Sequence, residues 1–131
     1  MEREILFRGK LFDGEWIEGV PVSNDTITCI FKLTDGLSEL KGFQVNPSTV
    51  GQYTGLTDKN GVKIFEGDIL KRGSHKYVVE WCDDCAMFVL PCITDKKLES
   101  DFTVFYGYDF EIIGNIHDNP EILRGEDLKN E

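Results

Sequence analysis

The 131 residues include 24 acidic and 14 basic side chains, which gives a formal net charge of −10. Hydrophobic residues make up 40% of the chain, which is enough to bury a core and excludes a disordered acidic tail. The charge argues against a general DNA or RNA binder, because phosphate binding depends on clustered Lys and Arg. The length predicts a single domain over residues 1–131.

The first third of the chain predicts β-strands. Strands over residues 3–12 and 15–20 flank Asp13-Gly14, a dipeptide that favours a hairpin with a two-residue type I′ turn. Residues 25–33 alternate as a half-buried strand does, with apolar side chains sharing one face: Ile27, Cys29, Phe31 and Leu33. A turn at residues 34–36 ends this strand.

The middle of the chain predicts more turn than strand. A short apolar segment at residues 43–45 ends at Asn46-Pro47, and residues 50–61 read as a loop that ends in an Asn-Gly turn. Within this loop, Asp58 and the two residues Asn60-Gly61 resemble the start of a calcium-binding loop. The glycine falls at the fourth position instead of the sixth, so we interpret the segment as a β-turn.

Short apolar runs predict six strands in the second half of the chain: residues 63–65, 68–72, 76–81, 86–90, 102–106 and 110–116. Asn119 precedes Pro120 as an N-cap precedes a first helical proline, so residues 120–124 predict a short helix that Gly125 ends. Long helices do not alternate with the strands. We therefore predict an all-β fold with minor α content, a small barrel or roll with extra hairpins and a short C-terminal helix.

The acidic residues are concentrated near the C-terminus. Residues 99–131 hold nine acidic and two basic side chains, whereas residues 1–98 hold fifteen acidic and twelve basic ones. A solvated surface that keeps the protein soluble explains this distribution. The alternative is an acidic docking face for a basic partner, such as a nucleic-acid-binding protein.

The start of the chain is charged and lacks the apolar run of a secretory signal. The longest apolar run, residues 86–90, falls far short of the roughly 20 residues that a membrane helix needs. We therefore expect a cytoplasmic protein with no membrane partner. In that compartment the four cysteines are reduced thiols.

Cys82-x-x-Cys85 has the spacing of half a tetrahedral zinc site. The other two ligands would have to come from Cys29, Cys92, His75 or His117, because the chain has no second Cys-x-x-Cys and no paired histidines. The motif also joins two predicted strands, whereas a redox-active pair sits at the N-terminus of a helix. We predict thiols in an ordinary hairpin and no metal site.

No recognisable catalytic motif is present: the chain has neither a Gly-x-Ser-x-Gly elbow nor a phosphate-binding loop. We therefore predict no enzymatic activity, no catalytic residues and no cofactor. The basic hairpin around Lys71, Arg72 and Lys76 lies beside Tyr77 and Trp81, and such a loop could stack single-stranded bases. The alternative is a solvated hairpin whose aromatic side chains lie in the core, and it suits the acidic charge better.

Two stretches, residues 50–70 and 113–123, go beyond generic strands and turns. Together with residues 3–10 and Gly14-x-Trp16-x-x-Gly19, they resemble the YopX family of phage and prophage proteins, in the same order and over nearly the whole chain. The resemblance implies one YopX-like domain over residues 1–131, a small SH3-like β-roll, and a phage or prophage origin in a bacterial host cell. The cysteine pair departs from the expected family pattern, and the resemblance implies no activity.

The polar residues of these motifs are the candidates for a binding site. Structural hydrogen bonds in the turns explain them more readily than a ligand does. If a site exists, we expect it among these polar residues and the two tryptophans: Trp16, Tyr53, Glu66, Asp68, Trp81 and Asn115.

The chain as a whole predicts a phage or prophage accessory protein that acts as a non-enzymatic protein-interaction module. Its partner would be a phage or host protein, and homo-oligomers are compatible with such a role. The alternative is a small β-barrel module that acts on phage DNA or RNA through the basic hairpin, although the net charge makes nucleic acid the less favoured partner.

Overall fold

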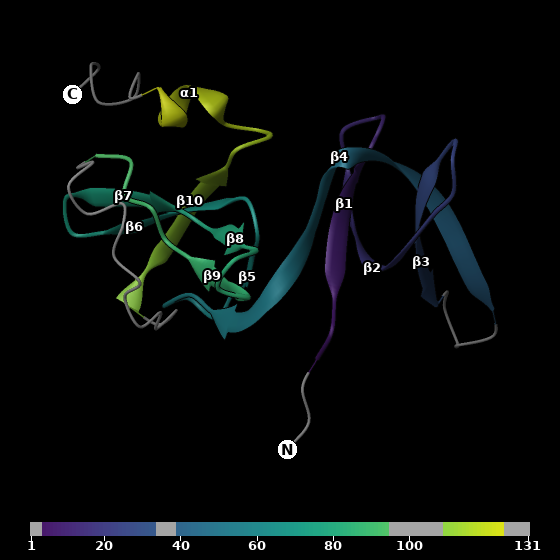
Figure 1. Cartoon of the computed structure of the whole chain (residues 1–131), viewed down its shortest axis with the longest axis horizontal. Helices are drawn as coiled ribbons and strands as arrows, with labels where there is room; N and C mark the ends of the chain where they lie inside the picture. The colour runs from purple at the N-terminus through teal and green to yellow at the C-terminus, as the bar shows by residue number, and fades with distance from the viewer. Residues whose placement is uncertain (1–3, 34–38, 95–108, 125–131) are drawn as a thin grey trace. The chain divides into compact units, whose positions relative to one another are not determined.

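The computed structural model describes residues 4–33, 39–94 and 109–124 (Figure 1). These residues form ten strands and one short helix, which confirms the predicted all-β class with minor α content. The predicted turn at residues 34–36, the predicted strand at residues 102–106 and much of the acidic C-terminal quarter lie outside the described residues.

The chain divides into two compact units, Met1–Tyr53 and Thr54–Glu131, which we call the N-terminal and C-terminal units. The boundary falls inside one long strand, β4 (Leu40–Thr57), so this strand contributes to both units. Each unit has its own buried residues and is described separately.

The N-terminal unit consists of β1 (Phe7–Leu11), β2 (Trp16–Ser23), β3 (Thr28–Leu33) and most of β4. All neighbouring strands are antiparallel, and β4 pairs with β3 on one side and with β1 on the other. The pairings therefore run in a closed ring, and each of these four strands has a partner on both sides. The SH3-like form expected for the fold stays a prediction.

The predicted hairpin between β1 and β2 is confirmed, but the predicted type I′ turn is wrong. The carbonyl of Leu11 accepts from the N–H of Gly14 at 2.9 Å, and the N–H of Leu11 donates to the carbonyl of Glu15 at 2.8 Å. Gly14 has a φ of 100°, whereas Asp13 does not have the positive φ that a type I′ turn requires. The loop thus has three residues, and Phe12 is displayed at its tip.

The face of β3 that is buried is not the predicted one. The side chains of Thr28 and Ile30 fill the interior of this unit, and not those of the predicted apolar face. Ile30 is fully buried and Thr28 is buried, whereas Phe31 is half-buried and Ile27 is 38% exposed. Gly19 on β2 explains the difference, because a Cβ there would lie 2.9 Å from Cγ2 of Ile30. Both faces of β3 are partly apolar, so alternation alone does not say which one is buried.

The predicted loop over residues 50–61 is wrong up to Thr57, where β4 ends. The pairing of β4 with β1 supplies the hydrogen bonds that the local sequence does not suggest. Asn46-Pro47 marks an irregularity within the strand and not its end, because the register with β1 shifts between Arg8 and Lys10.

A local network holds this irregularity in place. The side-chain oxygen of Asn46 accepts from the N–H of Ser48 at 3.1 Å and from its hydroxyl at 2.9 Å. The buried hydroxyl of Thr49 donates to the carbonyl of Asn46 at 2.6 Å and accepts from the N–H of Lys10 at 2.9 Å. The bulged segment is thereby tied to β1.

The described strands of the C-terminal unit, besides the end of β4, are β5 (Lys63–Phe65), β6 (Asp68–Arg72), β7 (His75–Val78), β8 (Glu80–Cys82), β9 (Met87–Val89) and β10 (Glu111–Asn115). They form a sheet in the order β10-β6-β7, a β8–β9 hairpin and the pairing of β5 with β4. The predicted strands at 63–65 and 68–72 are confirmed, whereas the one at 76–81 divides at Val79 into β7 and β8.

The predicted C-terminal helix is confirmed as α1 (Pro120–Leu123), with Pro120 in its first turn. Asn119 occupies the N-cap position, but its side chain does not cap the helix. Its oxygen instead accepts from the N–H of Asn115 at 3.2 Å. The predicted stop at Gly125 lies outside the described residues.

Both faces of the β10-β6-β7 sheet are covered. One face packs into the larger buried cluster of this unit: Ile64, Leu70, Tyr77, Val79, Leu90, Cys92 and Phe110. On the other face Ile69 and Val78 pack with Ile122 of α1. Because consecutive side chains of β6 point to opposite faces, Ile69 and Leu70 are both fully buried.

A buried carboxylate joins the turn after β4 to β10. Asp58 is 4% exposed, and its side chain accepts from the N–H groups of Asn60 at 2.8 Å, Val62 at 3.0 Å and Ile112 at 3.1 Å. Burial by itself raises the pKa of Asp58, but these three donors, with the charge of Lys59, outweigh it and leave the pKa below its ordinary value. The predicted β-turn is confirmed, and its aspartate also binds a distant strand.

We expect Asp58→Asn to lower the free energy of unfolding at pH 7 by about 2 kcal/mol, because the amide loses the charge and cannot accept all three N–H groups. The depressed pKa means that the carboxylate stabilises the fold above the unfolded pKa of about 4, and that this contribution is lost as the pH falls through the folded value. Urea unfolding at a series of pH values should show the two proteins converging in acid. The exposed Asp25→Asn is the control, and a constant difference at all pH values would contradict the assignment.

We expect Gly19→Ala to destabilise the protein by about 1–3 kcal/mol, because a methyl group there meets Ile30 and the backbone of Phe31. Gly42→Ala is a matched control. The atoms it would meet belong to the ring of Phe31, which is half-buried and able to turn away. Urea unfolding of both variants measures the difference, and equal losses would show that backbone approach at Gly19 is not the cause.

Candidate functional site

Three predicted site residues lie close together in the C-terminal unit. Asp68 and Asn115 face each other in the register of β6 and β10, and Glu66 lies in the turn just before β6. Asp68 is 2% exposed and Asn115 is 9% exposed, whereas Glu66 is half-buried. The side chains of Asp68 and Asn115 are thus largely closed to solvent.

Neighbouring backbone N–H groups donate three hydrogen bonds to the side chains of this pair. Asp68 accepts from the N–H of Phe65 at 2.8 Å. The side-chain oxygen of Asn115 accepts from the N–H groups of His117 and Asp118, each at 2.9 Å, and its amide donates to the Asp118 carboxylate at 3.2 Å. These contacts support a structural role for both side chains, while a role in binding stays a prediction.

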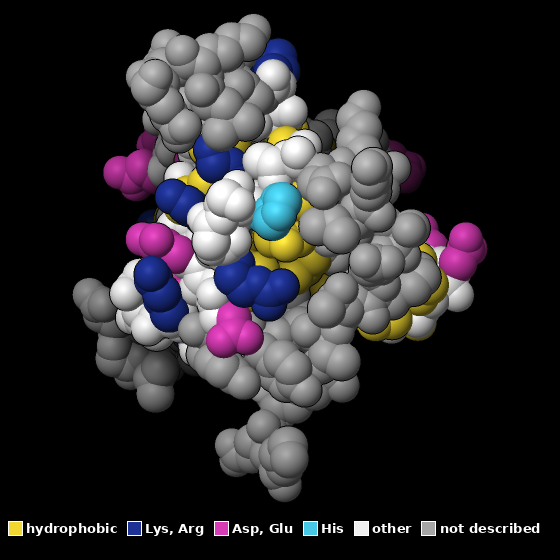
Figure 2. All heavy atoms as spheres, turned by 90° about the vertical axis from the view of Figure 1, so that its left-hand side faces the viewer, with side chains coloured by type: hydrophobic (Ala, Val, Ile, Leu, Met, Phe, Trp, Pro, Cys, Tyr) yellow, Lys and Arg dark blue, Asp and Glu magenta, His cyan; other side chains and the backbone are white. Residues whose placement is uncertain are grey.

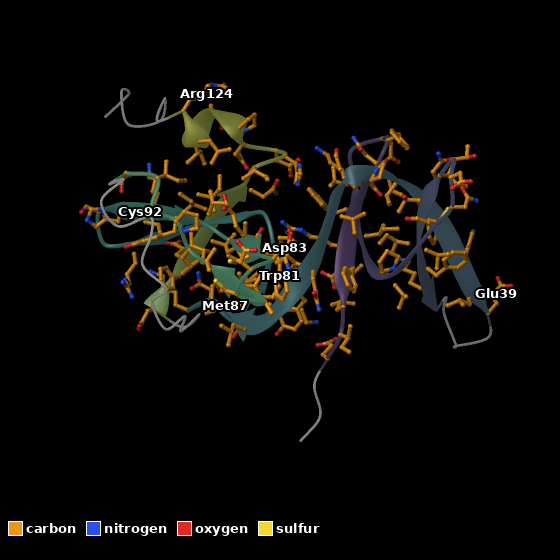
Figure 3. All side chains as sticks on the ribbon, in the orientation of Figure 1. Glu39, Trp81, Asp83, Met87, Cys92 and Arg124 are labelled. Atoms are coloured by element: carbon orange, nitrogen blue, oxygen red, sulfur yellow. The ribbon has the colours of Figure 1, made fainter. Side chains whose placement is uncertain are left out.

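The three aromatic candidates are divided between the two units. Trp16 and Tyr53 belong to the N-terminal unit, where both are half-buried. The guanidinium of Arg8 lies 4.6 Å from the ring centroid of Trp16, in a cation–π contact. Trp81 in the C-terminal unit is 43% exposed and packs edge-on against Phe88 at 5.1 Å, at the hairpin labelled in Figure 3.

The basic hairpin of β6 and β7 exposes two of its three basic side chains but not its tyrosine. Figure 2 shows Lys and Arg side chains beside a histidine on the face of the C-terminal unit that carries these strands. Lys71 and Arg72 are exposed, whereas Lys76 and Tyr77 are buried. The ring of Tyr77 packs edge-on against Phe110 at 5.6 Å, so it is not available to stack on a base.

Two of the residues considered as zinc ligands, His75 and Cys92, lie close to each other. Neither belongs to the Cys-x-x-Cys motif. The Sγ of buried Cys92 is 3.8 Å from Nδ1 of His75, and the same nitrogen is 2.9 Å from the hydroxyl of Thr94. His75 is half-buried at the start of β7. No group of three or more His, Cys, Asp or Glu side chains suited to a metal ion occurs among the described residues.

Sequence reasoning missed a groove in the N-terminal unit. It encloses about 310 Å³ between the β1–β2 loop, the turn before β3 and the bulge of β4. Its apolar lining comes from Phe12, Ile27, Val45 and Pro47. Phe12 is 69% exposed, although it is a large aromatic residue. The sequence offers one signal for this groove: an aromatic residue, Phe12, lies directly before the Asp-Gly turn. The predicted strand over residues 3–12 includes Phe12, whereas the structure places it in the loop.

A short polar network presents Ile27 to this groove. The side-chain oxygen of Asn24 accepts from the N–H groups of Thr26 at 2.7 Å and Ile27 at 2.9 Å. The N–H of Asn24 donates to the carbonyl of Ile27 at 3.0 Å, which closes the turn. These bonds fix the backbone of the turn that carries Ile27 into the lining of the groove.

No helix among the described residues is long and apolar enough to cross a membrane. The same residues include a single helix, α1, of four residues.

We expect Asn115→Ala to lower the free energy of unfolding by about 1–2 kcal/mol, because it leaves the N–H groups of His117 and Asp118 without their acceptor in a part-buried turn. Asn24→Ala is a matched control. It also removes a side-chain oxygen that accepts from two backbone N–H groups, but in an exposed turn. Thermal unfolding of both variants gives the comparison. A loss at Asn115 no larger than that at Asn24 would argue against the structural role.

No functionally curated protein matches the chain in sequence. Among solved structures, the chain is similar to the crystal structure of protein EF1440 from Enterococcus faecalis, with a TM-score of 0.56 and 26% sequence identity. This similarity covers 93% of the chain and 99% of EF1440. The model of the YopX protein family matches residues 7–124, which takes in all the described strands and α1. The chain therefore belongs to the YopX family.

Proposed function

We propose that this protein is a phage or prophage accessory protein that acts by binding another protein and not by catalysis. The observation that supports the proposal is the groove of the N-terminal unit, with Phe12 and Ile27 exposed on its rim. Exposed apolar side chains that gather at one place on a protein commonly mark an interface.

The dimensions of the groove favour side chains of a partner over a cofactor. Its volume of about 310 Å³ is at the lower end of the range for small-molecule sites. The exposed rings and methyl groups of Phe12 and Ile27 would gain roughly 25 cal/mol for each Å² of apolar surface covered. A loop that enters with one or two apolar side chains would bury both rim residues.

The charge around the groove favours a basic partner. Asp25 lines it, and Asp13 and Glu15 follow Phe12 in the exposed loop. The described residues that line the groove include no Lys or Arg. We therefore infer a phage or host protein that presents an apolar side chain next to Lys or Arg, so that its charge complements the rim.

The alternative nucleic-acid function has less support. It needs basic and aromatic side chains on one accessible hairpin, and Lys76 and Tyr77 are buried. Titration with single-stranded DNA at low salt would detect it through an affinity that falls steeply as salt rises.

We expect the double variant Phe12→Ser with Ile27→Ser to lose its protein partner, because it removes the apolar rim without touching a buried residue. The experiment is affinity capture from a bacterial lysate with quantitative mass spectrometry. Recovery of the partner should fall about tenfold or more, because truncating residues at the centre of an interface usually weakens binding by at least about 1.4 kcal/mol, which is a factor of ten in affinity. The control is Val62→Ser, which removes a side chain that is 52% exposed in the C-terminal unit.

Added salt should also weaken the captured complex, because acidic and basic groups meet at the rim. A partner retained equally by the double variant and by the control would show that binding occurs elsewhere. A capture that yields no protein dependent on Phe12 and Ile27 would count against the proposed function.

A further inference from the structure

The hairpin of β8 and β9 carries two cysteines at its tip. Cys82 is the last residue of β8 and pairs directly with Met87, the first residue of β9. The chain reverses within the four turn residues between them, and Cys85 is one of these. A reversal this short places the two cysteines three residues apart around a single turn.

The backbone after Cys85 is unusual. Ala86 has a φ of 53°, and it is the one non-glycine residue with a positive φ among the described residues. The left-handed region costs an ordinary residue roughly 1 kcal/mol, so the surrounding hairpin must hold Ala86 in it. This conformation returns the chain to β9 immediately after the second cysteine.

The two thiols differ in accessibility. Cys85 is exposed and Cys82 is half-buried, and both are free. Of the other two cysteines, Cys92 is buried and Cys29 is half-buried in the N-terminal unit. A reagent in solution therefore meets the thiol of Cys85 first, and Cys82 is the cysteine closest to it along the hairpin.

The thiols also interact with each other. A side-chain hydrogen bond with Cys82 raises the pKa of the Cys85 thiol, and burial and the charges of Cys82 and Asp84 raise it further. Less of Cys85 is then ionised at neutral pH, so its reaction as a thiolate is slow there and faster in mild alkali.

We propose that Cys82 and Cys85 form an intramolecular disulfide when the protein meets a low-molecular-weight disulfide, with Cys85 as the attacking cysteine and Cys82 as the resolving one. The thiolate of Cys85 attacks one sulfur of the small disulfide, which forms a mixed disulfide and releases one small thiolate. The thiolate of Cys82 then attacks the sulfur of Cys85, closes the protein disulfide and releases the second small thiolate. The two cysteines lose two electrons and two protons, and the small disulfide is reduced to two thiols.

Cys82→Ser provides the sharpest test, because it removes the resolving thiol and leaves the attacking one. The full chain is incubated with oxidised glutathione at mildly alkaline pH, and intact mass and peptide mapping follow the products. The native protein should lose two hydrogen atoms and yield a linked Cys82–Cys85 peptide. The variant should instead keep one glutathione on Cys85.

Two further variants complete the test. Cys85→Ser should form neither the linked peptide nor the adduct at the hairpin, and Cys29→Ser should behave as the native protein does. Far-UV circular dichroism verifies that each variant is folded. A stable glutathione adduct on Cys85 of the native protein would overturn the proposal, and so would oxidation that links either hairpin cysteine to Cys29 or Cys92.

Discussion

The long strand β4 pairs with β3 along its first residues and with β1 along the residues that follow, and the N-terminal unit depends on this double pairing. It gives each of the four strands two partners, so none of them is an edge strand of this sheet. It also requires β4 to change direction, which the bulge after Asn46 permits. The groove lies at this bulge, with Pro47 in its lining, so the irregularity that allows the strands to close also shapes the proposed binding surface.

Elements with local signals were predictable from the sequence. Strands β5 and β6 are separated by Glu66-Gly67, and α1 begins at a proline, so their limits follow from turn and helix chemistry within a few residues. Strand β4 was not predictable, because its hydrogen bonds come from segments up to 45 residues away in the sequence. The buried face of β3 was likewise decided by glycine on a neighbouring strand and not by its own alternation.

The candidate site shows the same division between local and distant causes. The motif residues Asp68 and Asn115 were selected from the sequence as polar and were recognised as suited to turn hydrogen bonds, and their observed contacts fit that interpretation. Their position opposite each other across two strands depends on a pairing that the sequence does not reveal. The groove escaped prediction because its lining comes from three separate segments, none of which carries a motif.

The bond from Asp58 to Ile112 joins residues that are 54 positions apart, and this separation bears on the order of folding during synthesis. The ring of pairings in the N-terminal unit is complete once Gln52 has met Phe7, so the strand segments that form it all leave the ribosome before β10 has been made. In the C-terminal unit, the carboxylate of Asp58 has all three of its backbone donors only after β10 has been made, because Ile112 of β10 is the third donor. The first unit can therefore form co-translationally, whereas the second acquires the bond from Asp58 to Ile112 only after β10 has been made.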